Sequence, residues 1–197
     1  MGGHIALNIS DYGNKFEVAG LLDDDPDKIG KELFGYPVVG PIDEALNFKD
    51  VNIVVGISFP EIKRQVIHKL IKNQSLAFPT LLHRNAWISE GVSVGLGSVI
   101  YPGNCINYGS EIGDFVVMNM NCSLGHHTKI GSFTSLAPGV NTGGHTQIGQ
   151  GVDVGIGVST IQNVKIGDQS VIGGQSMVIR EVMPESTVMG IPAREKP

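Results

Sequence analysis

The first part of the chain alternates short apolar runs with turns. Residues 17–22 and 51–57 are apolar enough for buried strands, and residues 78–82 form a third short run. Between the last two runs, residues 58–61 (Ser-Phe-Pro-Glu) have the spacing of a capping box, so a helix is expected to begin there. A strand, a helix and a strand in this order predict a parallel βαβ unit. Residues 1–83 are therefore expected to form a small Rossmann-like α/β domain.

A different pattern begins at Ile88, where an apolar residue returns at every sixth position as far as Val178. Fourteen of these sixteen positions are aliphatic, the residue two before each is small or β-branched, and the residue after is Gly in nine cases. A period of six fits neither an α-helix nor a hairpin meander. It is typical of a parallel β-helix, in which three six-residue sides make an 18-residue coil and strands stack about 4.8 Å apart. Residues 84–197 are predicted to form such a β-helix with a C-terminal tail.

Composition supports this division and narrows the possible partners. The 27 glycines are about twice the usual frequency, as expected if each corner needs φ > 0 or a close backbone approach. With 14 Lys and Arg against 19 Asp and Glu, the net charge of −5 offers no basic surface for nucleic acid or an anionic membrane. Two cysteines make no disulfide framework, and neither a signal peptide nor a membrane-spanning run is evident. A cytoplasmic protein is expected.

Several segments resemble one family of hexapeptide-repeat enzymes. The β-helix columns look like the left-handed β-helix acyltransferases, and five further segments narrow the likeness to sugar acetyltransferases of the sialic acid O-acetyltransferase type. This group includes the enzymes that N-acetylate UDP-linked amino sugars on the way to bacillosamine. The five segments are residues 2–4 (Gly-Gly-His), 22–24 (Leu-Asp-Asp), 35–40, 78–83 and 190–194. The resemblance implies a left-handed β-helix, a homotrimer, and acetyl-CoA as cosubstrate, with no metal.

The resemblance places the general base at His126, which follows the aliphatic Leu124 by two positions on the outer wall. An imidazole can accept the proton of an acceptor amine or hydroxyl while it attacks the thioester. Relatives have an acidic residue at the position of His127, so the orienting role of that residue is in question here. One coil of 18 residues above these two lie Gly144 and His145. Gly144 is a candidate for stabilising the oxyanion through its N–H.

Acetyl-CoA in the resembling enzymes lies between neighbouring prisms of the trimer. By motif position, His145 is a candidate for substrate or cofactor contact, and Ser135 stands where some relatives have another histidine near the cofactor. The pantetheine arm and the phosphates are expected beside Gly155, Ile156, Gly173, Gly174, Arg180 and Arg194. The alternative to a functional role for each of these residues is an ordinary position on the surface or at a corner. The same alternative applies to His126 and Gly144.

The N-terminal domain of the resembling enzymes holds the nucleotide sugar. The corresponding residues are Gly2, Gly3, His4, Asp23 and Asp24. Relatives have a strand before the Gly-Gly-His turn and another glycine after it, whereas this chain starts at the turn and continues with Ile5. Either the natural protein begins upstream of Met1 or the domain is rebuilt, and a parallel sheet without that strand would leave neighbouring backbone groups unpaired. For the acidic residues 23–25, the plain alternative is a solvated turn.

Two other classes of function remain open at this point. A γ-type carbonic anhydrase binds zinc through three histidines. One of them lies about 36 residues, or two coils of such a β-helix, before a closely spaced pair, and the histidines here do not have this spacing. A non-catalytic scaffold would use the flat walls of the β-helix, and the fold alone does not separate it from an enzyme. The sequence favours an acetyl-CoA-dependent acetyltransferase acting on the amine of a nucleotide-linked amino sugar, with sugar or sialic acid O-acetylation as the alternative.

Overall fold

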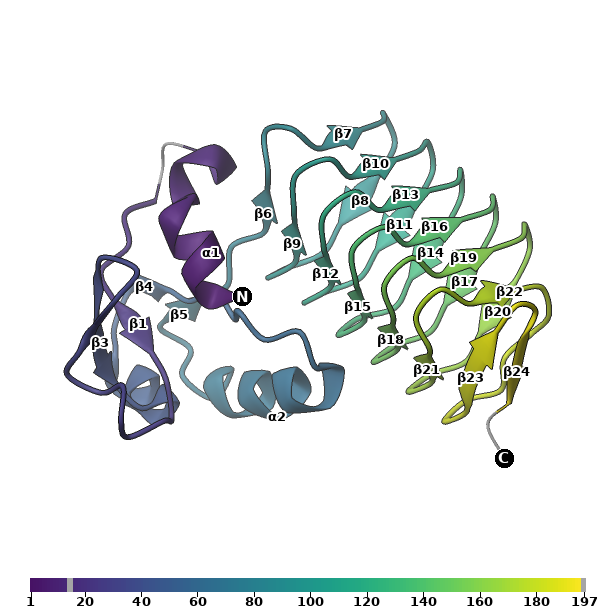
Figure 1. The fold of residues 1–197 in the computed structure, drawn as a ribbon. Helices are drawn as coiled ribbons and strands as arrows, with labels where there is room; N and C mark the ends of the chain where they lie inside the picture. Colours follow the sequence, from purple (N-terminus) through teal and green to yellow (C-terminus); the bar gives the residue numbers. More distant parts are fainter. Residues whose placement is uncertain (14–15, 196–197) are drawn as a thin grey trace. The chain divides into compact units, whose positions relative to one another are not determined.

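The chain folds into two compact units. A computed structural model describes residues 1–13 and 16–195 (Figure 1). One unit comprises Met1–Ser58 and Ile62–Pro79, and the other comprises Phe59–Glu61 and Thr80–Pro197. The division comes after Pro79 rather than after His83, because the next strand already pairs within the β-helix. In the part of the chain that the structure describes, every helix is too short or too polar to cross a bilayer.

The first unit holds two small sheets that share no strand among the described residues. β1 (Leu21–Leu22) pairs in parallel with β3 (Tyr36–Gly40), which also pairs antiparallel with β2 (Glu32–Leu33). β4 (Val51–Asn52) pairs in parallel with β5 (Leu76–Ala77). β1 and β4 are shorter than the predicted strands. Each pairs with a single neighbouring strand, and its backbone hydrogen bonds continue only where that neighbour runs beside it.

The predicted parallel strand–helix–strand unit is present, but its second strand is β5 (Leu76–Ala77) instead of the expected residues 78–82. α2 (Pro60–Leu70) connects β4 to β5, whereas β6 (Leu81–Leu82) pairs with the β-helix strand β9. The expected single strand over residues 78–82 is therefore wrong. Pro79 lies between the two short strands, and a proline has no N–H to donate to a ladder. The remaining helical segments are α1 (Gly2–Leu7), η1 (Ile9–Tyr12) and η2 (Ile42–Asn47).

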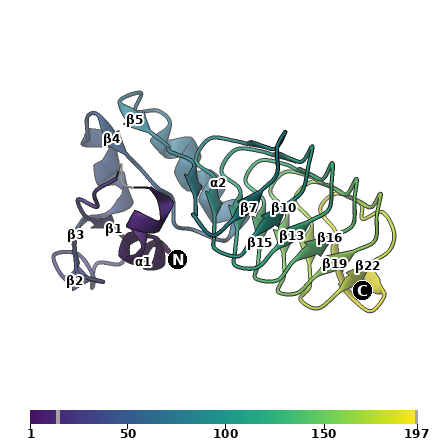
Figure 2. The same ribbon diagram turned by 90° about the horizontal axis from the view of Figure 1, so that it is seen from above.

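The second unit is a parallel β-helix with three faces, visible as a stack of coils in Figures 1 and 2. Each face is named here after its first strand. The β6 face contains β6, β9 (Val99–Ile100), β12 (Val117–Met118), β15 (Ser135–Leu136), β18 (Asp153–Val154), β21 (Val171–Ile172), β23 (Thr187–Gly190) and the antiparallel β24 (Ala193–Glu195). The β7 face contains β7 (Trp87–Ile88), β10 (Cys105–Ile106), β13 (Ser123–Leu124), β16 (Asn141–Thr142), β19 (Ser159–Thr160) and β22 (Met177–Val178). The β8 face contains β8 (Ser93–Val94), β11 (Glu111–Ile112), β14 (Lys129–Ile130), β17 (Gln147–Ile148) and β20 (Lys165–Ile166).

The register of these faces is the predicted 18-residue offset. Cys105 pairs with Ser123 and Ile106 with Leu124, and the same offset holds for the other two-residue strands of the coils. The aliphatic column fills the axis, where Ile106 is fully buried. Hydroxyls of the small column bond to the backbone of the corner, as Ser98 Oγ does with the Gly113 carbonyl oxygen at 2.8 Å. Burial of one aliphatic side chain per side therefore holds the coils together.

Two sets of corner positions explain how the coils close. The glycine that follows an aliphatic residue serves close approach: a Cβ on Gly125 would lie 2.5 Å from the Gly144 nitrogen of the next coil. The left-handed backbone occurs two residues further on, at every sixth residue from Gly91 to Gln175, with φ between 54° and 75°. Several of these positions are not glycine. His127 and His145 are two of them, both with φ of 56°.

Candidate functional site

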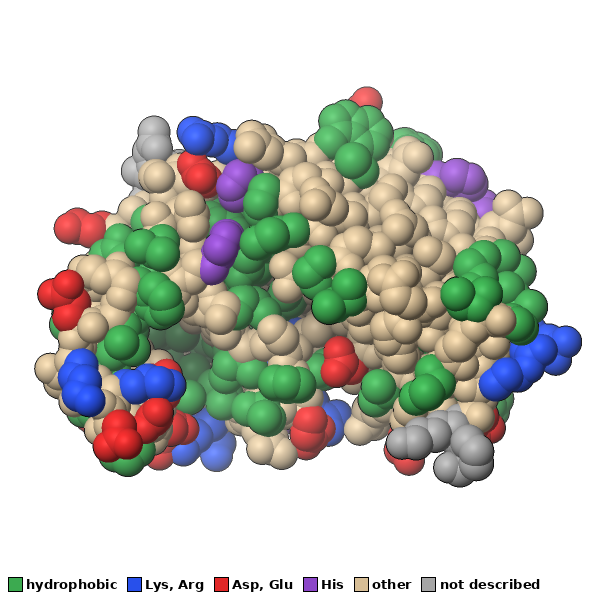
Figure 3. Space-filling model, in the orientation of Figure 1, with side chains coloured by type: hydrophobic (Ala, Val, Ile, Leu, Met, Phe, Trp, Pro, Cys, Tyr) green, Lys and Arg blue, Asp and Glu red, His purple; other side chains and the backbone are tan. Residues whose placement is uncertain are grey.

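Three histidines lie on neighbouring coils at the corner between the β7 and β8 faces. His126 and His127 follow β13, and His145 follows β16, which is stacked directly on β13. The His127 N–H donates to the Tyr108 carbonyl oxygen at 2.9 Å, and the His145 N–H donates to the His126 carbonyl oxygen at 2.9 Å. We call this corner, with residues 108, 126, 144, 162 and 180 and the residue after each, the histidine edge. All three histidine side chains are exposed, and histidine atoms appear at the surface over these coils in Figure 3.

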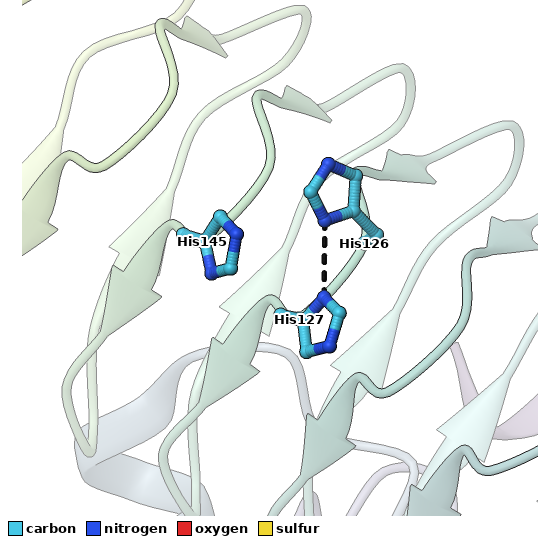
Figure 4. Close-up of side chains that lie close together, drawn as sticks. All are labelled: His126, His127 and His145. Atoms are coloured by element: carbon cyan, nitrogen blue, oxygen red, sulfur yellow. Dashed lines mark hydrogen bonds between the residues drawn. The ribbon is translucent and has the colours of Figure 1, made fainter.

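The three imidazole rings contact one another (Figure 4). His127 and His145 are stacked, with centroids 4.9 Å apart and an interplanar angle of 12°, as the 18-residue offset predicts. The His126 ring is nearly perpendicular to both and lies 4.9 Å from the His145 centroid. His126 Nδ1 and His127 Nδ1 are 3.0 Å apart, so one ring donates a hydrogen bond to the other. Adjacent residues on a strand would point to opposite sides, but the left-handed backbone at His127 brings its ring back beside His126.

Gly144 lies against the ring of His126 on the next coil. A Cβ at this glycine would be 2.8 Å from His126 Nε2, so only glycine leaves the ring in its observed place. At the corner between the β8 and β6 faces, three of the equivalent N–H groups donate to the side chain one coil above, as the Leu96 N–H does to Asp114 Oδ1 at 2.8 Å. On the histidine edge, neither His126 N–H nor Gly144 N–H has a hydrogen-bond partner among the described residues. For His126 the reason is that the residue above it is Gly144, which has no side chain.

The sequence reasoning missed two residues that shape this cluster. Tyr108 makes an edge contact with the His127 ring, with centroids 5.6 Å apart. Gly109 leaves room for the same ring, because a Cβ there would lie 2.9 Å from His127 Cδ2. The signal was available, since both residues lie one 18-residue coil before His126 and His127.

No carboxylate bonds to any of the three rings within the described residues. The nearest charged pair along the chain is Lys129 with Glu111 on the β8 face, where Lys129 Nζ and Glu111 Oε1 are 2.8 Å apart. Both residues line a shallow groove that follows the β8 face beside the histidine edge. Its lining combines charged and polar side chains, such as Glu111, Lys129 and Lys165, with apolar ones, such as Ile130 and Met183. The histidine edge is therefore open to solvent, and the nearest ion pair lies on the adjoining β8 face.

The residues expected beside the pantetheine arm lie on a different corner from the histidines. Gly155 and Gly174 pack closely, because a Cβ on Gly155 would be 2.6 Å from the Gly174 nitrogen. Ile156 is 59% exposed next to them. These residues, with Gly173, follow β18 and β21 at the corner between the β6 and β7 faces, which we call the glycine edge. Ser135 lies on β15 of the β6 face and is buried. The β7 face therefore separates the two groups within one chain.

The two arginines expected near phosphates come together. Arg180 is on the histidine edge, three coils beyond His126, and Arg194 is on β24. Both line one small pocket, together with Glu181 and Glu195. Two guanidinium groups at one pocket favour a phosphate-bearing ligand, although the two carboxylates oppose it.

In the first unit, the residues expected to bind the nucleotide sugar have local structural roles. Gly2, Gly3 and His4 begin α1 rather than forming a turn, and a Cβ on Gly3 would collide with the Phe34 ring. Asp23 accepts the Asp25 N–H at 3.0 Å and contacts Lys28 Nζ at 3.0 Å, and these hydrogen bonds lower its pKa. Asp24 Oδ1 accepts the Ile42 N–H at 2.8 Å. Asp24 Oδ2 has no partner among the described residues.

Comparisons with known proteins agree with this architecture. The family described as PglD N-terminal domain matches residues 2–70. No curated protein sequence matches the chain significantly.

Several solved structures match the chain over nearly its whole length. A mutant of perosamine N-acetyltransferase from Caulobacter crescentus, in complex with CoA and GDP-perosamine, is 25% identical with a TM-score of 0.89, covering 100% of this chain and 93% of its own. The acetyltransferase domain of PglB from Neisseria gonorrhoeae FA1090, in complex with acetyl coenzyme A, is 25% identical with a TM-score of 0.90, covering 98% and 92%. WeeI from Acinetobacter baumannii AYE is 25% identical with a TM-score of 0.82, covering 90% and 85%. The predicted fold, a small α/β domain followed by a left-handed parallel β-helix, is confirmed. Residues 2–70 thus match the PglD N-terminal domain family, and the chain as a whole is similar to left-handed β-helix acetyltransferases of the bacillosamine and perosamine type.

Proposed function

We propose that this protein transfers the acetyl group of acetyl-CoA to the amine of a nucleotide-linked amino sugar. The observation that carries the proposal is the exposed imidazole of His126 beside Gly144, whose N–H has no partner among the described residues, in a chain whose structural neighbours bind CoA, acetyl-CoA and GDP-perosamine. An amine acceptor is favoured over a hydroxyl because the perosamine enzyme is an N-acetyltransferase. Because the proposed reaction consumes acetyl-CoA and a nucleotide-linked sugar, we place it in the cytoplasm, where both are made.

His126 acts as the general base in this proposal. Its Nε2 lies beside Gly144, and its Nδ1 faces His127. When His126 Nδ1–H donates to His127 Nδ1, the lone pair of His126 Nε2 is free to accept a proton. The acceptor amine attacks the thioester carbonyl carbon, its nitrogen loses a proton to Nε2, and the C–N bond forms. The C–S bond then breaks, and the protonated His126 returns the proton to the departing thiolate.

Gly144 stabilises the negative charge that develops on the thioester oxygen. Its N–H has no partner among the described residues and lies on the coil next to His126. A preorganised donor of this kind is worth about 3 kcal/mol when the site excludes water. Because Gly144 also leaves room for the His126 ring, one residue would serve both the base and the oxyanion.

His127 takes the place of a carboxylate as the orienting partner of the base. A neutral imidazole can accept the hydrogen bond from His126 Nδ1–H and so hold the productive tautomer. It cannot supply the fixed negative charge that would stabilise a protonated His126. The stacked ring of His145 and the edge of Tyr108 restrict the His127 ring from two sides.

Acetyl-CoA would bind between two copies of the chain in a homotrimer. The histidine edge of one copy would face the glycine edge of the next, so that Gly155, Ile156, Gly173 and Gly174 line the pantetheine arm. Such an arrangement brings together two groups that the β7 face separates within one chain. Ser135 lies on the β6 face, where it is buried, and its contribution to the cofactor site is the weakest of the set. Arg180 and Arg194 would meet the phosphates of the cofactor.

Within the first unit, we assign recognition of the nucleotide to Asp24 more than to Asp23. Both oxygens of Asp23 are engaged, with the Asp25 N–H and with Lys28. Asp24 is exposed and keeps Oδ2 for a donor on the ligand. Gly2, Gly3 and His4 would approach the sugar or phosphates from the start of α1, although Gly3 is buried by its contact with Phe34.

The test is release of free thiol from acetyl-CoA with a panel of UDP-, GDP- and dTDP-linked amino sugars. The same sugars bearing a hydroxyl in place of the amine provide the O-acetylation arm, and mass spectrometry locates the added acetyl group. We expect turnover with at least one amino sugar and little with its hydroxyl counterpart. Replacing His126 with Asn should lower kcat by about 100- to 10,000-fold, the range for loss of a general base.

A matched control is His68→Asn, which makes the same chemical change at an exposed histidine of α2. It should keep the wild-type rate. Thiol release that persists at the wild-type rate in H126N would reject His126 as the base. Absence of turnover with every sugar of the panel would reject the proposed function and favour a scaffold.

A further inference from the structure

The cluster of His126, His127 and His145 has the composition of a transition-metal site. One nitrogen of each ring lies within 4.8 Å of the others, and all three rings are exposed. Neutral imidazole is the commonest protein ligand for zinc, copper and nickel. Three histidines with an open fourth position are also the ligand set of zinc sites that keep a water molecule.

The spacing of the rings is close to what one cation requires. Two nitrogens bound to one tetrahedral Zn²⁺ lie about 3.3 Å apart, since each Zn–N bond is about 2.0–2.1 Å. His126 Nδ1 and His127 Nδ1 are already 3.0 Å apart. The His145 ring lies 4.9 Å from both other rings, centroid to centroid, and rotation of an exposed side chain brings its nitrogen within reach.

Binding of a cation needs no proton to leave the cluster. Each neutral ring carries one N–H and one lone pair, and the short Nδ1–Nδ1 contact requires one Nδ1 to carry its proton. A change of that ring to its other tautomer moves the proton to Nε2 and frees both Nδ1 lone pairs. The cation then replaces the hydrogen bond between the rings.

We propose that His126, His127 and His145 bind one Zn²⁺ or a similar divalent transition-metal cation, and that the bound cation inhibits acetyl transfer. The inhibition follows from the function proposed above, because a cation on His126 Nδ1 removes its hydrogen bond to His127 and places a positive charge beside the base.

The experiment is calorimetric titration of the full chain with Zn²⁺, without acetyl-CoA or sugar. We expect saturable binding of one Zn²⁺ per chain, and a loss of affinity of about tenfold or more in each of H126N, H127N and H145N. Asn is the suitable replacement because it tolerates the left-handed backbone at residues 127 and 145. His68→Asn is the matched control and should keep the wild-type affinity. Unfolding temperatures of the variants near that of the wild type establish that the fold is intact.

A second measurement connects the site to activity. With an accepted sugar, Zn²⁺ should inhibit thiol release, EDTA should restore it, and H145N should need about tenfold more Zn²⁺ for the same fractional inhibition of its own metal-free rate. No saturable Zn²⁺ binding, or equal affinity in H145N and wild type, would overturn the proposed site. Binding without inhibition would overturn the inhibitory role. Because the titration contains no substrate, it decides the metal site even if no sugar is accepted.

Discussion

Replacing Gly144 with Ala separates the role of this glycine in catalysis from its role in folding. The backbone at Gly144 is outside the left-handed region, so Ala can adopt it without strain. Such a replacement stabilises a fold by about 0.4–1 kcal/mol through the unfolded chain, less any steric cost in the folded state. The three atoms nearest to the new Cβ all belong to the exposed ring of His126, which can move. Stability should therefore be unchanged or slightly raised.

The structure sets the size of the effect on activity. The new methyl carbon would lie 2.8 Å from His126 Nε2, whereas ordinary contact begins at 3.4 Å, so the ring must retreat by at least 0.6 Å. Misplacement of a reacting group by about 1 Å costs up to about 100-fold. We expect kcat to fall by about 10- to 100-fold, which corresponds to about 1.4–2.7 kcal/mol of barrier.

The assay combines thiol release with thermal unfolding, and Gly125→Ala is the matched control. At Gly125 a Cβ would meet the Gly144 nitrogen at 2.5 Å and the Gly143 carbonyl carbon at 2.7 Å. These are backbone atoms held by the stacked coils, so the control should lose about 1–3 kcal/mol of stability. A G144A protein with the wild-type rate, or one that loses activity only together with stability, would refute the reasoning.

Three further predictions test the packing, the thiols and the sharing of the site. Leu124→Ala, at a side chain that is 2% exposed on the axis, should cost about 2–5 kcal/mol in the free energy of unfolding measured with urea, whereas L96A, at a side chain 54% exposed, should change it by less than about 0.5 kcal/mol. Burial raises the pKa of Cys122 to about 11, so a thiol reagent at pH 8 should label the exposed Cys105 alone, and labelling of both thiols in the folded protein would contradict this. The stability that the protonated Cys122 thiol contributes should be lost as the pH rises from the usual thiol range through 11. If neighbouring copies share the site, an equal mixture of H126N and I156D, refolded together, should regain about a quarter of the wild-type rate. At about one interface in four, the intact histidine edge of an I156D copy meets the intact glycine edge of an H126N copy. No recovery beyond the rate of either variant alone would count against sharing.

The β-helix could be predicted closely because its sequence pattern and its geometry have the same period. An aliphatic residue every six positions determines which side chains face the axis, and the threefold repeat determines that residue 127 lies under residue 145. A slip by one residue would expose the whole column, so the register has no competing solution. The stacked pair of His127 and His145 follows from counting alone.

The contact between His126 and His127 could not be predicted in the same way. It depends on the left-handed backbone at His127. Glycine, Asn and His favour φ > 0, but the same column also contains Phe and Gln, which do not, so the residue types do not mark the column consistently. The prediction instead assigned the need for φ > 0 or close approach to the glycines after the aliphatic column. The structure shows that those glycines serve close approach to the next coil.

The first unit was harder to predict because its strands are short and locally ambiguous. Residues 78–82 read as one apolar strand, but Pro79 divides the pairing, and β5 and β6 join different sheets. Apolar periodicity alone does not say which partner a two-residue strand takes. In the same way, Asp23 and Asp24 look equivalent in sequence, and only the hydrogen bonds of the turn leave Asp24 Oδ2 available.

The positions of the proposed site residues bear on the proposal that neighbouring copies share the site. In a triangular coil, residues six positions apart occupy successive sides, so residues that follow different faces cannot converge however the side chains rotate. His126 and Gly144 follow the β7 face, whereas Ile156 and Gly174 follow the β6 face. A cofactor whose thioester reaches His126 while its arm lies along Ile156 would therefore either cross the whole β7 face of one chain or, as proposed, lie between two chains. By the same reasoning, Arg180 lies on the same edge of the same chain as the histidines, because it is 54 residues, or three whole coils, beyond His126.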